Sequence, residues 1–173
     1  MTDKHKFLKL LEQRVLWLSC WMIHNANHIR ENMDGLKVGG HQASSASIVS
    51  IMTALYFDIL KPEDRVAVKP HASPVFHAIQ YLAGLQTKEK IQNFRGFGGA
   101  QSYPSRTKDI DDVDISTGSV GLGVAMTSFM SLIQDYISQK QFTKKIPQGR
   151  MIALVGDAEL DEGNIWEAIA DPA

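Results

Sequence analysis

The chain has 173 residues, which suits one domain with a single sizeable core. Its formal net charge of -1 gives no electrostatic reason to expect nucleic acid or an anionic membrane as a partner. Cys20 is the one cysteine, which excludes an internal disulfide and a cysteine-rich zinc site. The polar N-terminus leads into no signal-peptide core, and no apolar run reaches the roughly 18 residues that span a bilayer. We therefore expect a cytoplasmic protein.

Hydrophobic periodicity predicts helices in the first half of the chain. Apolar residues at mixed three and four spacing over residues 6–33 predict an amphipathic helix, or two in succession. A glycine-bearing turn over 36–41 leads to a buried helix over 44–59, with serines available as caps. A short strand over 65–69 and a further helix over 73–82 follow.

The second half alternates loops, helices and a strand. Thr87 caps a short charged helix that ends near Asn93, and the aperiodic segment 94–114 is a long loop. A small-residue helix over 123–139 suits close packing against a sheet, and an apolar strand follows over 150–155. Alternating helices and strands predict an α/β fold, in which helices cover both faces of a parallel sheet within one domain of residues 1–173.

The end of the last predicted strand carries Gly156 and Asp157. Ligands bind at the carboxyl edge of open parallel sheets, where glycine permits close approach to a phosphate. An aspartate there is a hard oxygen donor suited to Mg²⁺ beside a diphosphate. A plain turn explains the pair equally well, and the acidic residues at 159, 161 and 162 are also typical of a helix start.

Glycines alternate over residues 115–123, just before a predicted helix. Exposed amides at a helix N-terminus bind anions, and glycines let a ring or phosphate approach the backbone. Close packing of the helix is an equal alternative, because a single glycine-rich loop is unspecific.

Two histidines lie next to turns and are candidate site residues. His41 follows a glycine pair and His71 follows a strand and Pro70, so both could reach one pocket and bind oxygen atoms or move protons. A surface position is the simpler alternative for each. His24 and His28 have metal-binding spacing but no third ligand nearby, which favours a solvated or interface face. For His77, within a helix, packing is expected.

The order of these pieces resembles the N-terminal, diphosphate-binding region of transketolase and pyruvate dehydrogenase enzymes, which use thiamine diphosphate. The resemblance begins near Ala26. It is carried, in chain order, by Gly39-Gly40-His41-Gln42-Ala43-Ser44, His71-Ala72-Ser73-Pro74, Asn93-Phe94-Arg95, Ser102-Tyr103-Pro104, Ser116-Thr117-Gly118-Ser119-Val120-Gly121-Leu122-Gly123 and Gly156-Asp157-Ala158-Glu159.

The resemblance implies a cofactor, a metal and site residues. Asp157 would be a ligand of Mg²⁺, and His41 and His71 would line the substrate side as catalytic residues. The reaction implied is cleavage of a carbon–carbon bond next to a carbonyl, with thiamine diphosphate as the electron sink. The implied cofactor-binding residues are Gly118, Val120 and Leu122 at the aminopyrimidine, and Gly156, Asp157, Ala158 and Glu159 at the diphosphate.

Within this superfamily, the Tyr103-Pro104 pair and the turn before His41 favour the homodimeric decarboxylase component of pyruvate dehydrogenase, acting on a 2-oxo acid. The alternative is transketolase, which transfers a two-carbon ketol unit between sugar phosphates. The stretch 161–168 favours that reading, whereas the chain lacks the histidine that transketolases carry near position 103. A nucleotide-binding α/β domain of another kind is a third reading.

The chain departs from the family pattern in two places. Ala158 stands where the family has glycine, which would cost on the order of 1 kcal/mol if that position needs a positive φ. The sequence ends at Ala173, before the strand that completes the metal site and before the pyrimidine-binding and C-terminal domains. We therefore expect a partial domain, inactive alone, that self-associates as a homo-oligomer or meets a second chain supplying the rest. A non-catalytic remnant used for assembly is the competing hypothesis.

Overall fold

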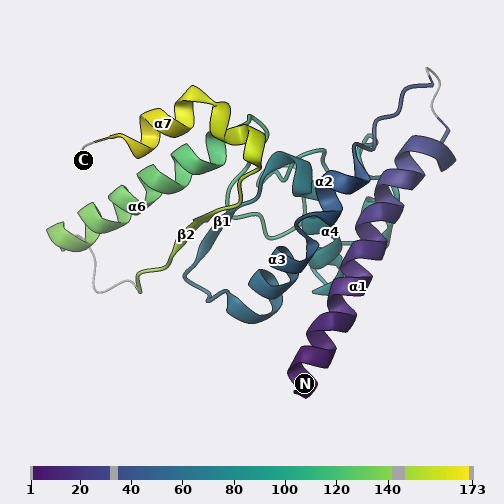
Figure 1. Ribbon diagram of the computed structural model, residues 1–173, viewed down its shortest axis with the longest axis horizontal. Helices are drawn as coiled ribbons and strands as arrows, with labels where there is room; N and C mark the ends of the chain where they lie inside the picture. Colours follow the sequence, from purple (N-terminus) through teal and green to yellow (C-terminus); the bar gives the residue numbers. More distant parts are fainter. Residues whose placement is uncertain (1, 32–34, 142–146, 172–173) are drawn as a thin grey trace. The chain divides into compact units, whose positions relative to one another are not determined.

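The computed structural model describes residues 2–31, 35–141 and 147–171. Two compact units are formed (Figure 1): the first comprises Met1–Leu60 with His71–Val113, and the second comprises Lys61–Pro70 with Asp114–Ala173. The prediction of one domain over residues 1–173 stays a prediction. No helix in the described ranges is both long and apolar enough to cross a membrane.

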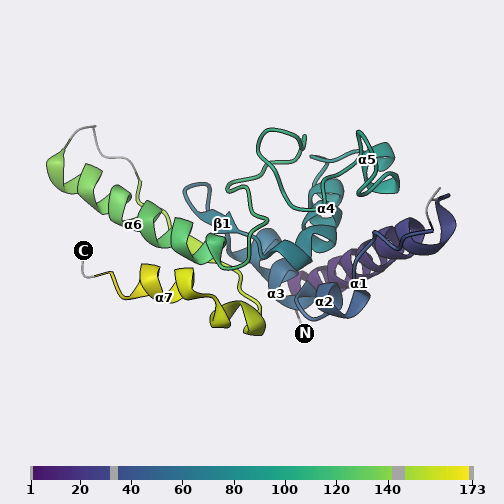
Figure 2. The same cartoon turned by 90° about the horizontal axis from the view of Figure 1, so that it is seen from above.

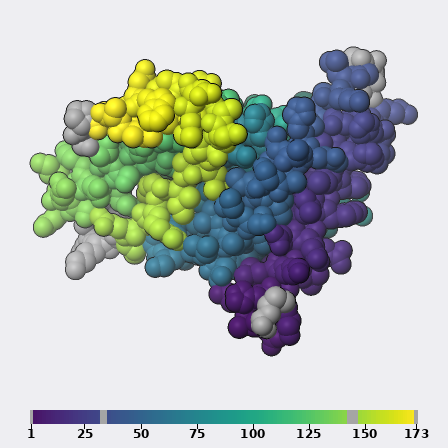
Figure 3. All heavy atoms as spheres, viewed as in Figure 1, coloured from purple at the N-terminus to yellow at the C-terminus, as the bar shows by residue number. Residues whose placement is uncertain are grey.

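The first unit begins with a long helix. Helix α1, Asp3–His24, continues into the π-helical turn η1, Asn25–Ile29. Thr2 caps α1, because its side chain accepts the backbone N–H of His5. The helix predicted over 6–33 is thus confirmed as far as Ile29, and Met33 lies outside the described residues. Phe7 and Trp17 are 61% and 60% exposed, so α1 keeps apolar side chains on its solvent face. The N-terminal part of α1 is drawn in purple in Figure 3.

The helix predicted over 44–59 is divided into three pieces. They are α2, Gln42–Ala46, α3, Val49–Ala54, and the π-helical turn η2, Leu55–Ile59. The expectation of serine caps is wrong for these described helices, since α2 follows His41 and α3 follows Ile48 with no side-chain cap. The serine hydroxyls bond elsewhere: Ser47 donates to the carbonyl of Ser44 at 3.0 Å.

Helix α4, Ser73–Leu82, is the core element of the first unit and has the predicted span. Every residue from Ser73 to Gln80 is buried, because α4 packs against α1, α2, α3 and α5. Helix α5, Lys88–Gln92, lies beside it (Figure 2) and is capped by Thr87 as predicted, with the Thr87 hydroxyl accepting the Lys90 N–H at 3.3 Å.

The second unit holds the sheet. Strands β1, Arg65–Ala67, and β2, Met151–Ala153, pair in parallel with Val66 opposite Ile152. Helix α6, Leu122–Lys140, packs on both strands, and α7, Gly163–Ile169, packs on α6 (Figures 1 and 2). The chain is therefore mostly helical with a small two-stranded parallel sheet in the described part, which agrees with the predicted α/β class at that coarser level.

Asp64 joins the starts of the two strands. Its buried carboxylate accepts the Arg150 backbone N–H at 2.8 Å, the Arg150 side chain at 2.5 and 3.2 Å, and the Lys61 N–H at 2.9 Å. The hydrogen bond from the Arg150 side chain, followed by those from the backbone amides, holds the pKa of Asp64 well below its ordinary value. The parallel register therefore has a charged clamp at its N-terminal end.

The ion pair between Asp64 and Arg150 makes the free energy of unfolding depend on pH. Since the folded-state pKa of Asp64 lies below the ordinary value near 3.9, the carboxylate stabilises the fold above that pH and loses this contribution as the pH falls toward the folded-state pKa. We expect Asp64→Asn to be less stable than the parent at pH 7, with the difference shrinking below about pH 4. Urea unfolding at several pH values measures this, with the exposed Asp135→Asn as control. A difference that does not change with pH would contradict the prediction.

Candidate functional site

The glycine-rich loop before α6 is built around Gly121. This glycine has φ +80°, and an added Cβ would lie 2.4 Å from Oδ1 of Asn164. The Asn164 side-chain amide donates to the Val120 carbonyl at 3.5 Å. At the next glycine, Gly123, a Cβ would lie 3.1 Å from that of Ala67 on β1. Close packing, one of the two alternatives for this loop, is therefore confirmed, while anion binding stays a prediction.

The candidate cofactor residues of this loop are all accessible in part. Gly118, Val120 and Leu122 are each half-buried, so none is locked inside the packed core of the second unit. The loop reaches α6 at Leu122, where the helix begins. A ligand can therefore still approach this backbone, as the predicted role requires.

The end of β2 leads into a short 3-10 helix, η4, Asp157–Asp161. Asp157 and Ala158 are exposed in this turn. Among the described residues other than glycine, only Arg95 and Gln141 have a positive φ. Ala158 therefore sits in an ordinary backbone conformation, and the departure from glycine costs no conformational strain here.

The amide of Gly156 already has a partner. Its N–H donates to Oε2 of Glu159 at 3.1 Å, and Glu159 is buried with 7% of its surface exposed. A diphosphate that used this amide would have to replace the Glu159 carboxylate. The predicted contact between the diphosphate and the backbone of Gly156 stays a prediction.

Three buried oxygen atoms of the second unit have no hydrogen-bond partner in the described part of the protein. They are Oγ1 of Thr117, Oε1 of Glu159 and Oδ1 of Asn164. Burying such atoms without partners is costly, so orphaned polar atoms are rare in folded proteins unless water or a ligand satisfies them. Thr117 and Glu159 belong to the two motifs assigned to the cofactor, and Asn164 contacts the glycine loop through its bond to Val120. The local chemistry therefore fits a polar guest.

His41 lies in the first unit, on a loop that is held against the helical N-terminal segment. Oδ1 of Asn27 accepts the Gly39 N–H at 2.6 Å, and the Asn27 amide donates to the Gly40 carbonyl at 3.2 Å. Gly40 has φ +87°, and Arg95 donates to the Val38 carbonyl at 2.7 Å. The His41 side chain is exposed and lines a cavity of about 350 Å³.

His71 is the other candidate catalytic residue. It is exposed in the 3-10 turn Pro70–Ala72 that precedes α4, and its carbonyl accepts the buried Ser45 hydroxyl at 3.4 Å. Both histidines therefore belong to the first unit, whereas Asp157 and the glycine loop belong to the second. The expectation that both histidines reach one pocket stays a prediction.

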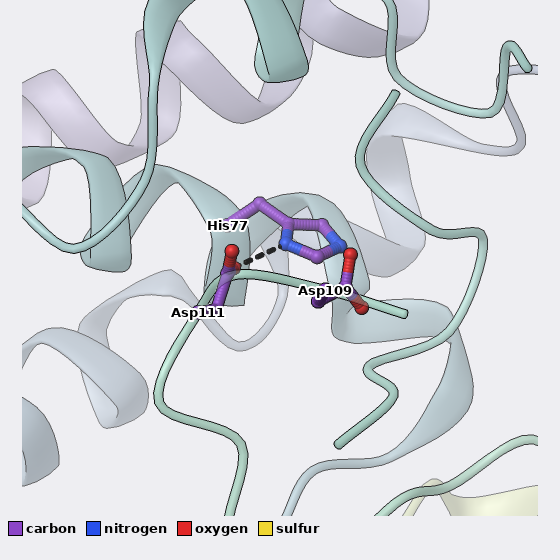
Figure 4. Close-up of side chains that lie close together, drawn as sticks. All are labelled: His77, Asp109 and Asp111. Atoms are coloured by element: carbon purple, nitrogen blue, oxygen red, sulfur yellow. Dashed lines mark hydrogen bonds and ion pairs between the residues drawn. The ribbon is translucent and has the colours of Figure 1, made fainter. Parts of the chain in front are cut away.

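A buried network around His77 is the feature that the sequence analysis missed. Nδ1 of His77 lies 2.6 Å from Oδ2 of Asp111 (Figure 4). Nε2 of His77 lies 3.0 Å from the Gln101 carbonyl. Gln86 donates to the other oxygen of Asp111. Asp109 accepts the N–H groups of Gln101 and Ser105, at 3.0 and 2.9 Å.

This network fastens the long loop 94–114 to α4. The ligand atoms of His77, Asp109 and Asp111 lie within 4.8 Å of one another, a spacing that a metal ion could use. Their oxygen and nitrogen atoms already have hydrogen-bond partners from the protein, so the arrangement is a structural one. A histidine within an apolar helix, together with the Asp-x-Asp pair at 109–111, was the sequence signal for it.

Comparison with known families agrees with these motifs. The family model described as "Transketolase, thiamine diphosphate binding domain" matches residues 36–171. The chain belongs to this family of thiamine-diphosphate-binding domains. This confirms the resemblance inferred from the sequence.

Individual relatives are similar to this chain at 26% to 31% sequence identity. Transketolase-like protein 2 of Mus musculus is 30% identical over 142 residues, which is 76% of this chain and 21% of the relative. The 6-deoxy-6-sulfo-D-fructose transketolase subunit SqwG of Clostridium sp. (strain MSTE9) is 31% identical over 161 residues, 84% of this chain and 54% of the relative. The pyruvate dehydrogenase E1 component of Mycolicibacterium smegmatis is 26% identical over 159 residues, 86% of this chain and 16% of the relative.

Two points follow from these relatives. The chain spans about a fifth of the length of the mammalian transketolase proteins it matches, at 21%. Both transketolase relatives are more similar to it than the pyruvate dehydrogenase component is. The comparisons therefore favour transketolase, the alternative in the sequence analysis, over the pyruvate dehydrogenase reading.

Proposed function

We propose that this chain is the diphosphate-binding part of a transketolase-type enzyme that transfers a two-carbon ketol unit between sugar phosphates. The observation that carries the proposal is the family match over residues 36–171, which includes each of the candidate site motifs. In the complete protein, further strands extend the parallel sheet and helices cover both of its faces.

In this proposal, the second unit binds the cofactor. Asp157, exposed at the end of the sheet, binds Mg²⁺, and the backbone of residues 156–159 binds the diphosphate. Gly118, Val120 and Leu122 hold the aminopyrimidine, at the loop where Thr117 and Asn164 have oxygen atoms to satisfy. Thiamine diphosphate supplies the electron sink for carbon–carbon bond cleavage when it is bound.

The first unit then serves the substrate. His41 and His71 have exposed imidazoles, so both can donate hydrogen bonds to hydroxyl or carbonyl oxygens of a ketose and move protons during the reaction. The hydrogen bonds between Asn27 and the backbone of Gly39 and Gly40 hold this loop in place, which limits the positions that the His41 side chain can reach. We assign both residues a role at the substrate side on this basis.

The remaining parts of the enzyme come from another chain or from another part of a longer protein, and copies of the chain associate. One relative supports the first arrangement, since its name describes it as a subunit of a transketolase. The exposed apolar residues of α6, which include Ile133 at 57% and Tyr136 at 54% exposed, are consistent with a surface that another chain covers.

Ligand binding distinguishes this proposal from a nucleotide-binding domain. Titration calorimetry on the full-length protein is expected to show saturable binding of thiamine diphosphate that depends on Mg²⁺, and none of ATP with Mg²⁺. Saturable ATP binding without any response to thiamine diphosphate would contradict the proposal.

A second candidate is the decarboxylase component of pyruvate dehydrogenase. It is favoured by the Tyr103-Pro104 pair and by a relative of that name that aligns with 86% of this chain. The complete enzyme distinguishes the two, because a decarboxylase releases carbon dioxide from pyruvate whereas a transketolase consumes a ketose and an aldose together.

A further inference from the structure

Three histidines line the cavity of about 350 Å³ in the first unit. His24 is the last residue of α1, His28 lies in the π-helical turn η1, and His41 precedes α2. All three side chains are exposed, so each can turn without leaving a packed core. His24 and His28 have no third ligand near them in sequence, and the fold places His41 at the same cavity.

The spacing of His24 and His28 suits two ligands of one metal ion. Residues four apart on a helix share a face, and the two rings have centroids 5.0 Å apart with a tilt of 37°. A tetrahedral zinc ion bonds imidazole nitrogens at about 2.0–2.1 Å, which places the centres of two ligating rings about 5 Å apart. The separation of the two rings is therefore compatible with their binding one ion. Its position at a π-helical turn is also typical of functional sites.

The loop that carries His41 is fastened to the same helical segment. Asn27, which lies between the two histidines in sequence, bonds the backbone of both Gly39 and Gly40. Gln42 donates to the Cys20 carbonyl at 3.1 Å. Gly39 approaches the helix so closely that an added Cβ would lie 2.5 Å from the Ile23 carbonyl oxygen. These contacts fix the backbone of His41 beside the pair.

We propose that His24, His28 and His41 form a binding site for one divalent cation of the zinc class. Imidazole nitrogen suits Zn²⁺, Co²⁺ and Ni²⁺, whereas Mg²⁺ prefers oxygen ligands, so the site is chemically separate from the one assigned to Asp157. In the described structure the ligand atoms of His24, His28 and His41 do not all lie within 4.8 Å of one another. Binding of the ion therefore requires the exposed His41 side chain to turn about its torsions toward the pair.

Occupation of this site has a consequence for the enzyme. An imidazole that ligates zinc is no longer free to contact substrate, and His41 is the ring that the proposed function places there. The cation is therefore an inhibitor that acts by withdrawing His41. This regulatory consequence rests on the proposed function, whereas binding of the cation does not.

Metal titration of the full-length protein without a polyhistidine tag tests the proposal. After dialysis against a chelator, Co²⁺ is added and the visible absorption of the ion is followed, and Zn²⁺ is then used to displace it. We expect one ion per chain with the intense absorption of a four-coordinate site. His24→Ala and His28→Ala are each expected to weaken binding at least about 10-fold, because the loss of an outer-shell partner alone costs about 10- to 100-fold.

Two further variants make the result decisive. His41→Ala is expected to weaken binding and to change the Co²⁺ spectrum, since it removes the third ligand. His71→Ala, an exposed histidine of the same unit outside this cavity, is expected to bind as the parent does. Unchanged affinity in His24→Ala or His28→Ala overturns the site, and an unchanged spectrum in His41→Ala overturns the third ligand. Because no thiamine diphosphate is present, failure here leaves the proposed function unaffected.

Discussion

Replacing His77 with leucine is expected to lower the free energy of unfolding by about 3 kcal/mol, the upper part of the range for leaving a buried polar group unsatisfied. His77 is fully buried and bonds both Asp111 and the Gln101 carbonyl. Its ring also packs edge-on against the rings of Phe76 and Phe94. A leucine keeps the apolar contacts but leaves both oxygen partners without a donor.

Urea unfolding measures this loss, and His71→Leu serves as control. That histidine is exposed, so its replacement is expected to change the free energy of unfolding by no more than about 0.5 kcal/mol. The double variant His77→Leu/Asp111→Leu removes the carboxylate as well and should cost less than the sum of the single changes, since no buried charge is left behind. Additive losses would show that the two residues do not act as a pair.

Replacing Asp157 with asparagine is expected to weaken Mg²⁺-dependent binding of thiamine diphosphate at least about 10-fold. The loss of an outer-shell partner of a metal ion alone costs about 10- to 100-fold in affinity, and Asp157 is proposed as a direct ligand. The substitution removes the negative charge of a metal ligand and keeps the shape of the side chain. Asp157 is exposed and no hydrogen bond of its carboxylate holds the fold together among the described residues, so the free energy of unfolding should stay within about 0.5 kcal/mol of the parent.

Asp161→Asn is the matched control for this experiment. Asp161 is also exposed and ends the same 3-10 helix, so it tests whether any lost carboxylate in this turn has the effect. Calorimetry at saturating Mg²⁺ and in the presence of a chelator separates the metal-dependent part of the affinity. Equal affinities for the parent and Asp157→Asn would remove this residue from the site.

Elements with a strong local signal were predictable from the sequence. Helix α4 has the predicted span, and Thr87 caps α5 as expected, because periodicity and capping act over a few neighbouring residues. Both strands were found at their predicted places, although each is shorter, since pairing partners decide where a strand ends. The break between α2 and α3 was missed; it lies at Ser47, whose hydroxyl donates to the Ser44 carbonyl inside the predicted helix.

The polar contacts that organise the fold could not be predicted in the same way. Asp64 and Arg150 are 86 residues apart, and His77 and Asp111 are 34 apart, so no local pattern connects them. The hydrogen bond from the Gly156 N–H to Glu159 could not be predicted either, because it depends on the rotamer of Glu159. By contrast, the motifs in order were enough to identify the family.

The parallel pairing of β1 with β2 has a consequence for the order of folding. The strands are separated by the whole segment His71–Val113, which belongs to the first unit. During synthesis, β1 leaves the ribosome long before β2 has been made, so the two strands cannot pair until later. Closing so long a loop costs entropy, and prior folding of the first unit lowers that cost by reducing the length of freely moving chain. We therefore expect the first unit to form early and the sheet to form last.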